Sequence, residues 1–515
     1  MDRFLPPAAA FICLALTASP LPVGAGSLTL TPLARHATGL FDQGAAEIPA
    51  WHAASRRLFV VNGAANTIDI LTFDGQELRP AGALALGRDE APTSVAVNGD
   101  RVAVAAYDPQ SPDWAGKIIL FSPDGRRVGE FAAGSMPDMV TFTPDGRHVL
   151  SADEGERNGA IDPEGSVTIV DLADGITNAV VRRAGFRAFD AGELKARGVR
   201  IFPDAESAGQ DLEPEYIAVS PDGRRAFVTL QENNAVAVVD IPAARVTDIW
   251  PLGVKDHMLP GNGLDASRKN GVRIANYPVF GLYMPDSIAA VTVAGETFLV
   301  TANEGDARKE DVKLGKARLA PGAVPPELLD DLAELEISAM DGDDDGDGRI
   351  ERPHSYGARS FSIWSAEDGS LIHDSGDDFE RITAERLGAA FNADNASAGS
   401  GDKRSPKKGP EPEGVAVGEM AGRIYAFIGL ERMGGIMVYD VTEPRTPTFV
   451  AYQLDRNLDS TFDYERPADL ARAGDLGPEG LLFVPGAESP TGAPLLIVAN
   501  EVSGTVTVYA VTANR

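Results

Sequence analysis

Acidic residues stand at matching positions in five similar segments of the 515-residue chain. In each segment one acid follows a proline that begins a strand-like stretch, and another follows the next strand-like stretch. The set is Asp138 with Asp153 and Glu154, Glu215 with Glu232, Asp286 with Glu304, Glu413 with Glu431, and Glu479 with Glu501. Carboxylate oxygens suit Ca²⁺ and other hard cations, so the pattern favours cation binding. The alternative for any single acid is to cap a turn or accept a backbone N–H.

Hairpin geometry predicts that the members of each pair lie at one edge of the protein. Asp286 and Glu304, for example, are centred on Gly295 in the turn-like sequence AGE. Since the start of one strand and the end of its antiparallel partner share an edge, we expect the five pairs at one rim near a central axis. Two further segments carry Ala50 and Thr93 at the first position, so the predicted acidic funnel is weighted to one side. Crowded carboxylates raise each other's pKa unless a cation is bound.

A second metal signal lies in the sequence DGDDDGDGRIE at 341–351. Its candidate ligands are Asp343, Asp345, Asp347 and Glu351. Placed at positions 1, 3, 5 and 9, with Gly348 at position 6, they match a Ca²⁺-binding loop of the EF-hand type. Position 12 is His354 instead of a bidentate Glu, so water or a distant carboxylate would complete the shell. The alternative is a solvated acidic linker. We expect Ca²⁺ as the main cofactor and a second metal, Fe or Zn.

Motifs for a protein nucleophile are missing from the sequence: it contains no G-x-S-x-G, H-E-x-x-H, P-loop or glycine-rich dinucleotide motif. Any hydrolytic chemistry would therefore use metal-activated water. Arg308 and Arg432 each follow a candidate ligand region and are candidate catalytic residues that would hold an anion. The alternative for both is ion pairing with neighbouring acids.

The elements that would position these acids form a repeat. Seven segments share a proline, a strand-like stretch, a turn and a second strand-like stretch, and they begin at Pro49, Pro92, Pro137, Pro214, Pro285, Pro412 and Pro478. The turns TPDG and SPDG are typical of hairpins, and the first repeats are roughly 45 residues apart, the length of one propeller blade. The repeat predicts an all-β, seven-bladed β-propeller. A pair of β-sandwiches is the alternative.

Unequal spacing of the later repeats indicates two loop insertions, at about 306–356 and 365–409. Apolar spacing predicts a helix in each, at 325–335 and 379–391. The stretch SLTLTPL at 27–33 precedes the first repeat. We expect it to supply the outer strand of the last repeat and so to close the ring.

Composition and charge limit the partners. The formal net charge of −30 disfavours nucleic acid and anionic membrane surfaces. Arg3, the apolar stretch 6–18 and the small residues at 23–25 are typical of a secretory signal peptide spanning 1–25. The only cysteine, Cys13, lies inside it, and no later apolar run reaches transmembrane length. We expect a periplasmic or secreted monomer in which 26–515 form the propeller.

Longer motifs carry a family resemblance. They include GNGLDASRKNG (261–271), GLYMPDSIA (281–289), TANEGDAR (301–308), GPEPEGVAV (409–417) and VANEVSGTVTVY (498–509). With them the chain resembles the choice-of-anchor I propeller proteins, which are similar to an animal mesenchyme-specific cell-surface glycoprotein. Some members are described as atypical alkaline phosphatases. The resemblance implies an extracytoplasmic propeller with phosphatase activity on a small phosphorylated substrate. Because a chain with a net charge of −30 would repel such a substrate, we expect that activity to depend on bound metal. The alternative is a non-enzymatic, Ca²⁺-stabilised binding or adhesion propeller at the cell surface.

Overall fold

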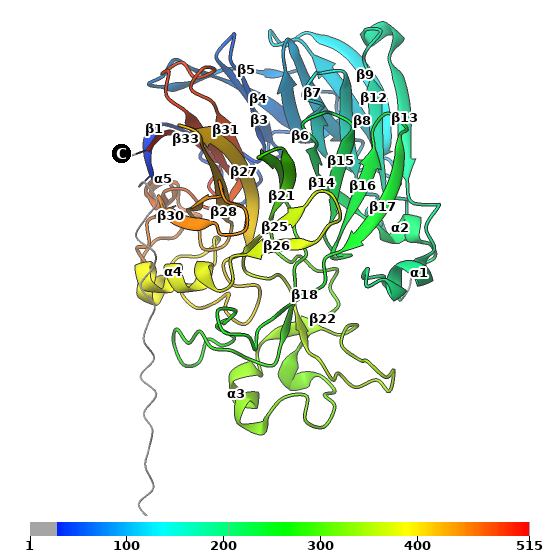
Figure 1. Cartoon of the computed structure of the whole chain (residues 1–515). Helices are drawn as coiled ribbons and strands as arrows, with labels where there is room; N and C mark the ends of the chain where they lie inside the picture. Colours follow the sequence, from blue (N-terminus) through cyan, green and yellow to red (C-terminus); the bar gives the residue numbers. More distant parts are fainter. Residues whose placement is uncertain (1–27, 204, 514–515) are drawn as a thin grey trace, which may run out of the picture.

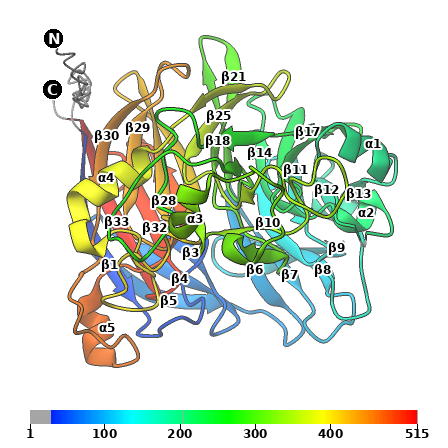
Figure 2. The ribbon, with the colours of Figure 1, turned by 90° about the horizontal axis from the view of Figure 1, so that it is seen from below.

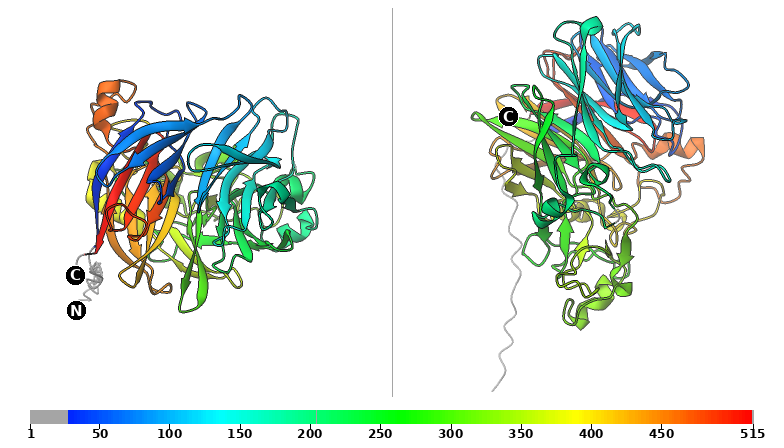
Figure 3. Two further views of the ribbon diagram at one scale, coloured as in Figure 1. Left: turned by 90° about the horizontal axis from the view of Figure 1, so that it is seen from above. Right: turned by 90° about the vertical axis from the view of Figure 1, so that its right-hand side faces the viewer.

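The computed structural model describes residues 28–203 and 205–513. The predicted signal peptide and its cysteine lie outside the described residues. Within them the chain forms seven four-stranded sheets and one five-stranded sheet. The four-stranded sheets surround a common centre, as the view from above in Figure 3 shows. The molecule is therefore all-β and propeller-like, as the repeat predicted.

The seven four-stranded sheets are built in chain order (Figure 1). The first four are β2 (Pro49–His52), β3 (Arg57–Asn62), β4 (Thr67–Phe73) and β5 (Leu78–Leu84); β6 (Ala91–Asn98), β7 (Arg101–Tyr107), β8 (Ala115–Phe121) and β9 (Arg127–Ser135); β10 (Pro137–Phe142), β11 (His148–Asp153), β12 (Ser166–Asp171) and β13 (Val180–Gly185); and β14 (Pro214–Val219), β15 (Arg225–Leu230), β16 (Ala235–Asp240) and β17 (Arg245–Pro251). The other three are β20 (Ile288–Val293), β21 (Glu296–Ala302), β25 (Phe361–Ser365) and β26 (Leu371–Asp374); β27 (Pro412–Met420), β28 (Arg423–Leu430), β29 (Ile436–Asp440) and β30 (Thr448–Gln453); and β31 (Pro478–Val484), β32 (Leu495–Asn500), β33 (Thr505–Ala513) and β1 (Leu28–Ala37).

The first strands of these sheets form a closed ring. Each of β2, β6, β10, β14, β20, β27 and β31 contacts the next, and β31 returns to β2. The last sheet is completed by the beginning of the described chain, because β1 pairs antiparallel with β33, from Leu28 opposite Ala513 to Ala37 opposite Thr505. Figure 3 shows this blue strand against the red C-terminal strands. The prediction that 27–33 supply the outer strand of the last repeat is confirmed for the described part of that stretch.

Local sequence explains the hairpins. Gly146 and Gly223 have φ of 66° and 68°, which their turns require and which glycine adopts at low cost. In the second turn the Ser220 hydroxyl donates to Asp222 at 2.6 Å. Between neighbouring sheets the inward side chains form apolar clusters, such as the one that joins Phe59 to Phe121, both fully buried. Burying each such side chain contributes roughly 1.5–3 kcal/mol.

The five-stranded sheet forms a lobe that projects from the ring (Figure 1), and Figure 2 views the molecule from the side that carries it. Its strands are β18 (Val254–Asp256), β19 (Phe280–Leu282), β22 (Asp311–Lys313), β23 (Glu336–Ser338) and β24 (His354–Ser355), with η2 (Leu314–Lys316), η3 (Pro326–Leu328) and α3 (Leu329–Leu332). The lobe combines the insertion predicted at about 306–356 with the connection between β17 and β20, which sequence did not identify as inserted. The helix predicted at 325–335 is only the short turn of η3 and α3.

The second insertion begins later than the predicted 365–409, because β26 is the outer strand of its sheet. Its helix, α4 (Asp378–Leu387), matches most of the predicted 379–391 and is followed by η4 (Gly388–Ala390). The remaining helices of the described chain are η1 (Ile176–Asn178), α1 (Ala191–Ala196), α2 (Ala208–Asp211) and α5 (Pro467–Ala473).

Candidate metal centre

A β-bulge carries the first acid in four sheets. The pairing register shifts directly after the proline that begins β10, β14, β27 and β31. The acids within these shifts are Asp138, Glu215, Glu413 and Glu479. A bulge inserts an unpaired residue and re-aims its side chain. The predicted pairing is therefore wrong in detail: Asp153 lies opposite Pro137, and Pro478 lies opposite Asn500.

These acids and Asp286 form what we call the inner ring: Asp138, Glu215, Asp286, Glu413 and Glu479. All but Glu215 line a small central cavity of about 60 Å³ together with Tyr216. No basic side chain of the described residues lines this cavity. Oε2 of Glu413 and Oε2 of Glu479 are buried and have no hydrogen-bond partner in the described chain. The ring thus places buried carboxyl groups around a cavity that no basic side chain of the described chain lines, although Lys408 acts on Asp286 from outside it.

Burial is the main cause of the perturbed acidities in the inner ring. It raises the pKa of Asp138 to about 6. Burial first, and then the charges of neighbouring acids, raise the pKa of Glu215, Asp286, Glu413 and Glu479 well above the usual range. Burial therefore disfavours the ionised carboxylates of the ring, and a bound cation would favour them.

A repeated backbone feature fixes the second acids just outside this ring. The residue before the proline has a positive φ in four sheets: Met136 (45°), Met284 (42°), Glu411 (52°) and Gly477 (68°). Their carbonyls accept hydrogen bonds from the backbone N–H of Glu154 (2.9 Å), Gly305 (3.0 Å), Glu431 (2.8 Å) and Glu501 (2.8 Å), respectively. A non-glycine residue in this conformation costs roughly 1–3 kcal/mol and is typical of functional sites.

Basic side chains neutralise part of this outer rim. Lys408 Nζ lies 2.6 Å from Glu304 Oε1, 3.0 Å from Asp306 Oδ1 and 3.1 Å from Glu411 Oε2. Arg432 contacts Glu431 Oε1 at 2.9 Å and Glu411 Oε2 at 3.1 Å. Burial would raise the pKa of Glu411, but Lys408 and the nearby arginines outweigh it and lower that pKa to about 2.

Geometry identifies two groups of three acids at the rim whose oxygens lie within 4.8 Å of one another: Asp286, Glu304 and Glu413, and Glu304, Glu411 and Glu431. The second group contacts Lys408 and Arg432, so its negative charge is balanced internally. Glu304 belongs to both groups, so Lys408 also pairs with one acid of the first. The other two acids of the first group, Asp286 and Glu413, have no salt bridge among the described residues, which makes it the better cation site.

Both candidate catalytic arginines are engaged in ion pairs, the alternative considered from the sequence. Arg432 is held by the two glutamates described above. Arg308 donates to Asp211 at 3.1 Å, pairs with Glu213, and its guanidinium carbon lies 4.4 Å from the centre of the Phe202 ring. Arg308 lines a pocket of about 440 Å³ beside the inner ring, together with Glu154 and Glu232.

One candidate ligand lies in a different environment from the others. Asp153 is fully buried, and its carboxylate accepts hydrogen bonds from Ser151 (2.6 Å), Ser166 (2.7 Å) and Thr168 (2.6 Å). Because both carboxylate oxygens of Asp153 already accept hydrogen bonds from hydroxyl groups of the same sheet, we no longer count Asp153 as a candidate metal ligand. Burial raises the pKa of Glu501, while nearby Arg432 opposes that rise.

The acidic loop of the lobe is separate from the rim. Oxygens of Asp343, Asp345 and Asp347 lie within 4.8 Å of one another on an exposed surface. Asp343 accepts from the backbone N–H of Gly346 at 2.7 Å and Gly348 at 2.9 Å. Glu351 is outside this group and accepts from Asp344 N at 2.9 Å.

Sequence reasoning missed acids that precede the repeat prolines. They are Glu47, two residues before Pro49, and Glu213 and Glu411, which directly precede theirs. Burial, then Glu501 and Asp138, raise the pKa of Glu47 to about 8. The acid–proline spacing was a usable signal. No sequence signal pointed to Lys408, because it contacts Glu304 from a distant part of the chain.

Comparisons with known proteins agree with the resemblance. The choice-of-anchor I domain matches residues 47–444. Gigasin-3a of Magallana gigas is 30% identical over 190 residues, covering 35% of this chain and 64% of that protein. The mesenchyme-specific cell surface glycoprotein of Strongylocentrotus purpuratus is 27% identical over 339 residues, covering 55% of this chain and 43% of that protein. The chain thus spans less than two-thirds of these curated relatives.

Among solved structures, Kuenenia stuttgartiensis hydrazine synthase aligns over 92% of this chain and 97% of its own, with a TM-score of 0.47 and 15% identity. The fold assignment rests on the sheets of this chain. Within the described residues, no helix has the length and apolar character needed to span a membrane.

Proposed function

The chain belongs to the choice-of-anchor I family. We propose that it is an extracytoplasmic seven-bladed β-propeller. We further propose that its inner ring binds a divalent cation, with Ca²⁺ as the preferred ion. In this proposal the seven four-stranded sheets are the blades of a domain spanning 26–515, which acts as a monomer in the periplasm or outside the cell. The cell-surface relative supports that location.

One observation carries the cation site: the inner ring contains buried carboxylate oxygens without partners, on Glu413 and Glu479. An unpartnered buried charge is costly, and a hard cation removes that cost with the ligand type it prefers. The strained residues around the rim, such as Glu411, support the same place. Asp343, Asp345 and Asp347 are proposed as a second, exposed Ca²⁺ site.

A second candidate function is a metal-dependent, alkaline phosphatase-like phosphomonoesterase. The observation that favours it is the position of Lys408 and Arg432 at the edge of the candidate metal group, where each contacts an acid of the rim. Basic groups beside a cation suit a phosphate anion. A bound metal, with Fe or Zn as the second ion, would activate water and polarise the phosphoryl oxygen. Lys408 and Arg432 would orient the anion. The non-enzymatic alternative is a Ca²⁺-stabilised adhesion propeller.

Equilibrium dialysis of EDTA-treated protein against Ca²⁺ tests the cation site. We expect the wild type to bind Ca²⁺ and Glu413→Gln to lose one ion per chain, while Glu385→Gln, an exposed acid on α4, serves as the matched control and binds as the wild type does. Equal binding by all three proteins would contradict the proposal. Hydrolysis of p-nitrophenyl phosphate at alkaline pH separates the two functions: turnover lost in Glu413→Gln supports the phosphatase, and no turnover in the metal-loaded wild type rejects it.

A further inference from the structure

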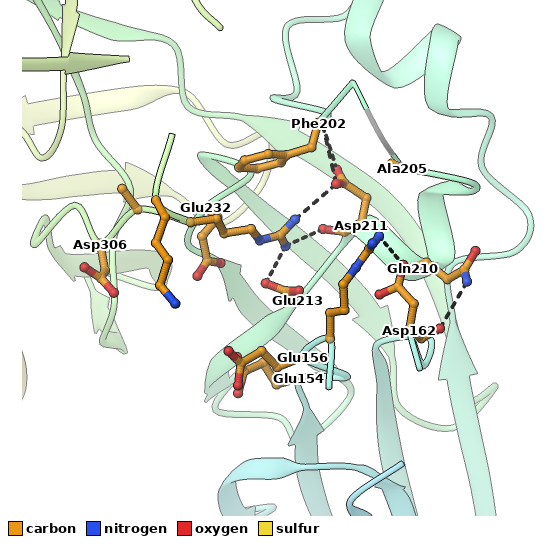
Figure 4. Close-up of a pocket in the computed structure, with 14 residues that line it drawn as sticks. Glu154, Glu156, Asp162, Phe202, Ala205, Gln210, Asp211, Glu213, Glu232 and Asp306 are labelled. Carbon is orange, nitrogen blue, oxygen red and sulfur yellow. Dashed lines mark hydrogen bonds and ion pairs between the residues drawn. The ribbon is translucent and has the colours of Figure 1, made fainter. Parts of the chain in front are cut away.

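The pocket beside the inner ring has a different chemistry from the ring itself. Its volume is about 440 Å³, within the range typical of small-molecule sites. The acids that line it are Glu154, Glu156, Asp162, Asp211, Glu213, Glu232 and Asp306. Figure 4 shows the carboxylates of Glu154, Glu156, Glu213 and Glu232 converging on one space from the ends of neighbouring strands.

Among the basic residues that line this pocket, Lys309 is exposed and has no ion pair within the described chain, whereas the two arginines are paired with acids. The Arg308 guanidinium is bound by Asp211 and Glu213, and Arg157 pairs with Asp162 at 2.6 Å. Lys408 pairs with Asp306 at 3.0 Å. These pairs leave three lining acids without a salt bridge among the described residues: Glu154, Glu156 and Glu232. The charge of Arg308 still acts on Glu232 from within the pocket.

Two of these three acids are deeply buried. Glu232 is 8% exposed, and its Oε2 has no hydrogen-bond partner in the described chain. Glu154 is 9% exposed, and no side chain in residues 28–203 or 205–513 donates to its carboxylate. Burying such groups without a partner is costly, so the pocket favours an occupant that carries positive charge.

The arrangement does not fit a single metal ion. The acid groups of the described residues that are compact enough to hold an ion do not contain Glu154 or Glu232. A protonated amine is larger and donates several separate hydrogen bonds, so it can bridge carboxylates that do not share one coordination sphere. The strongly negative protein also attracts such ligands.

We propose that this pocket binds a small organic amine whose protonated amino group lies between Glu232 and Glu154. A diamine suits it best, because Glu156 offers a further carboxylate at the more exposed side. This site is additional to the proposed cation site and uses none of the inner-ring acids.

Isothermal titration calorimetry with 1,4-diaminobutane tests the proposal, with saturating Ca²⁺ present so that metal sites are filled. We expect one diamine per chain, with affinity reduced at least about tenfold in Glu232→Gln and in Glu154→Gln, because each loses a charged hydrogen bond. Glu385→Gln should bind as the wild type does. Absence of binding, or unchanged affinity in both variants, would overturn the proposal.

A second measurement covers the case in which a variant does not fold. In the wild type with saturating Ca²⁺, 1,4-diaminobutane should raise the melting temperature in calorimetry and uncharged 1-butanol should not, whereas an equal midpoint with and without the diamine would also reject the site. Glu413→Gln separates the two proposals, because it should weaken Ca²⁺ binding and leave diamine affinity within about twofold of the wild type. Loss of diamine binding in that variant would instead assign the amine to the inner ring and overturn the separate pocket.

Discussion

Replacing Asp138 by asparagine should stabilise the metal-free protein at neutral pH. Burial raises the pKa of Asp138 from 3.8 to about 6 in the folded protein. A carboxyl group with a raised pKa in the folded state binds its proton more tightly there than in the unfolded state. Its favourable contribution to the free energy of unfolding is therefore complete below pH 3.8 and is lost as the pH rises through 6. A shift of roughly 2 units corresponds to about 3 kcal/mol once the group is ionised in both states. Asparagine avoids that loss.

Differential scanning calorimetry in EDTA provides the assay. For a chain of this size 1 kcal/mol moves the transition by roughly 1 °C, so Asp138→Asn should melt about 3 °C above the wild type at pH 7 and together with it near pH 4. With saturating Ca²⁺ the order should reverse, because the wild type gains the stability of the bound ion and the variant loses a ligand.

The matched control is Asp145, in the turn of the same sheet. Hydrogen bonds from the Thr143 hydroxyl and from Arg147 N lower its pKa, so Asp145→Asn should destabilise the protein at neutral pH. If Asp138→Asn melted at or below the wild type at pH 7 in EDTA, or if Ca²⁺ failed to reverse the order, the account of the inner ring would be refuted.

Three further outcomes are expected. Burial would raise the pKa of Glu90, but hydrogen bonds from Arg127 outweigh it and lower that pKa from 4.5 to about 2. The ionised Glu90 therefore stabilises the fold above pH 4.5, and this contribution is lost as the pH falls through 2. Glu90→Gln should cost about 2–3 kcal/mol at pH 7, measured as a melting temperature lowered by roughly 2–3 °C that approaches the wild-type value in acid. Lys408→Met leaves buried acids unpaired and should cost about 3–5 kcal/mol by the same calorimetry; an unchanged midpoint would show that Lys408 does not neutralise the rim. Changing Asp343 and Asp345 together to Asn should remove one Ca²⁺ per chain in equilibrium dialysis, and an unchanged count would exclude the loop as a site.

The ring of sheets was predictable because its signals are local. Each hairpin repeats a proline, alternating apolar residues and a turn such as the one at Gly146, whose positive φ the sequence anticipates. The closing strand β1 was also predicted, since the last repeat lacked an outer strand and Leu28 and Leu30 offered one. Hairpin symmetry placed most candidate acids near one rim.

The finer geometry depends on features that symmetry does not encode. The bulges after Pro137 and Pro478 shift Asp138 and Glu479 out of direct pairing with the second acids of their sheets. Hydroxyl groups of its own sheet donate hydrogen bonds to the carboxylate of Asp153. The rim is neutralised by Lys408, which the second insertion brings to Glu304. Contacts between residues so distant in sequence follow from the packed fold and leave no pattern within a single segment.

Anomalous scattering from crystals soaked in Mn²⁺ tests the central claim most directly. The account predicts a peak at the inner ring, within coordination distance of carboxylate oxygens from Asp286 and Glu413, and its disappearance in Glu413→Gln. A map with no peak there, or with peaks only at the exposed loop of Asp343, would contradict it.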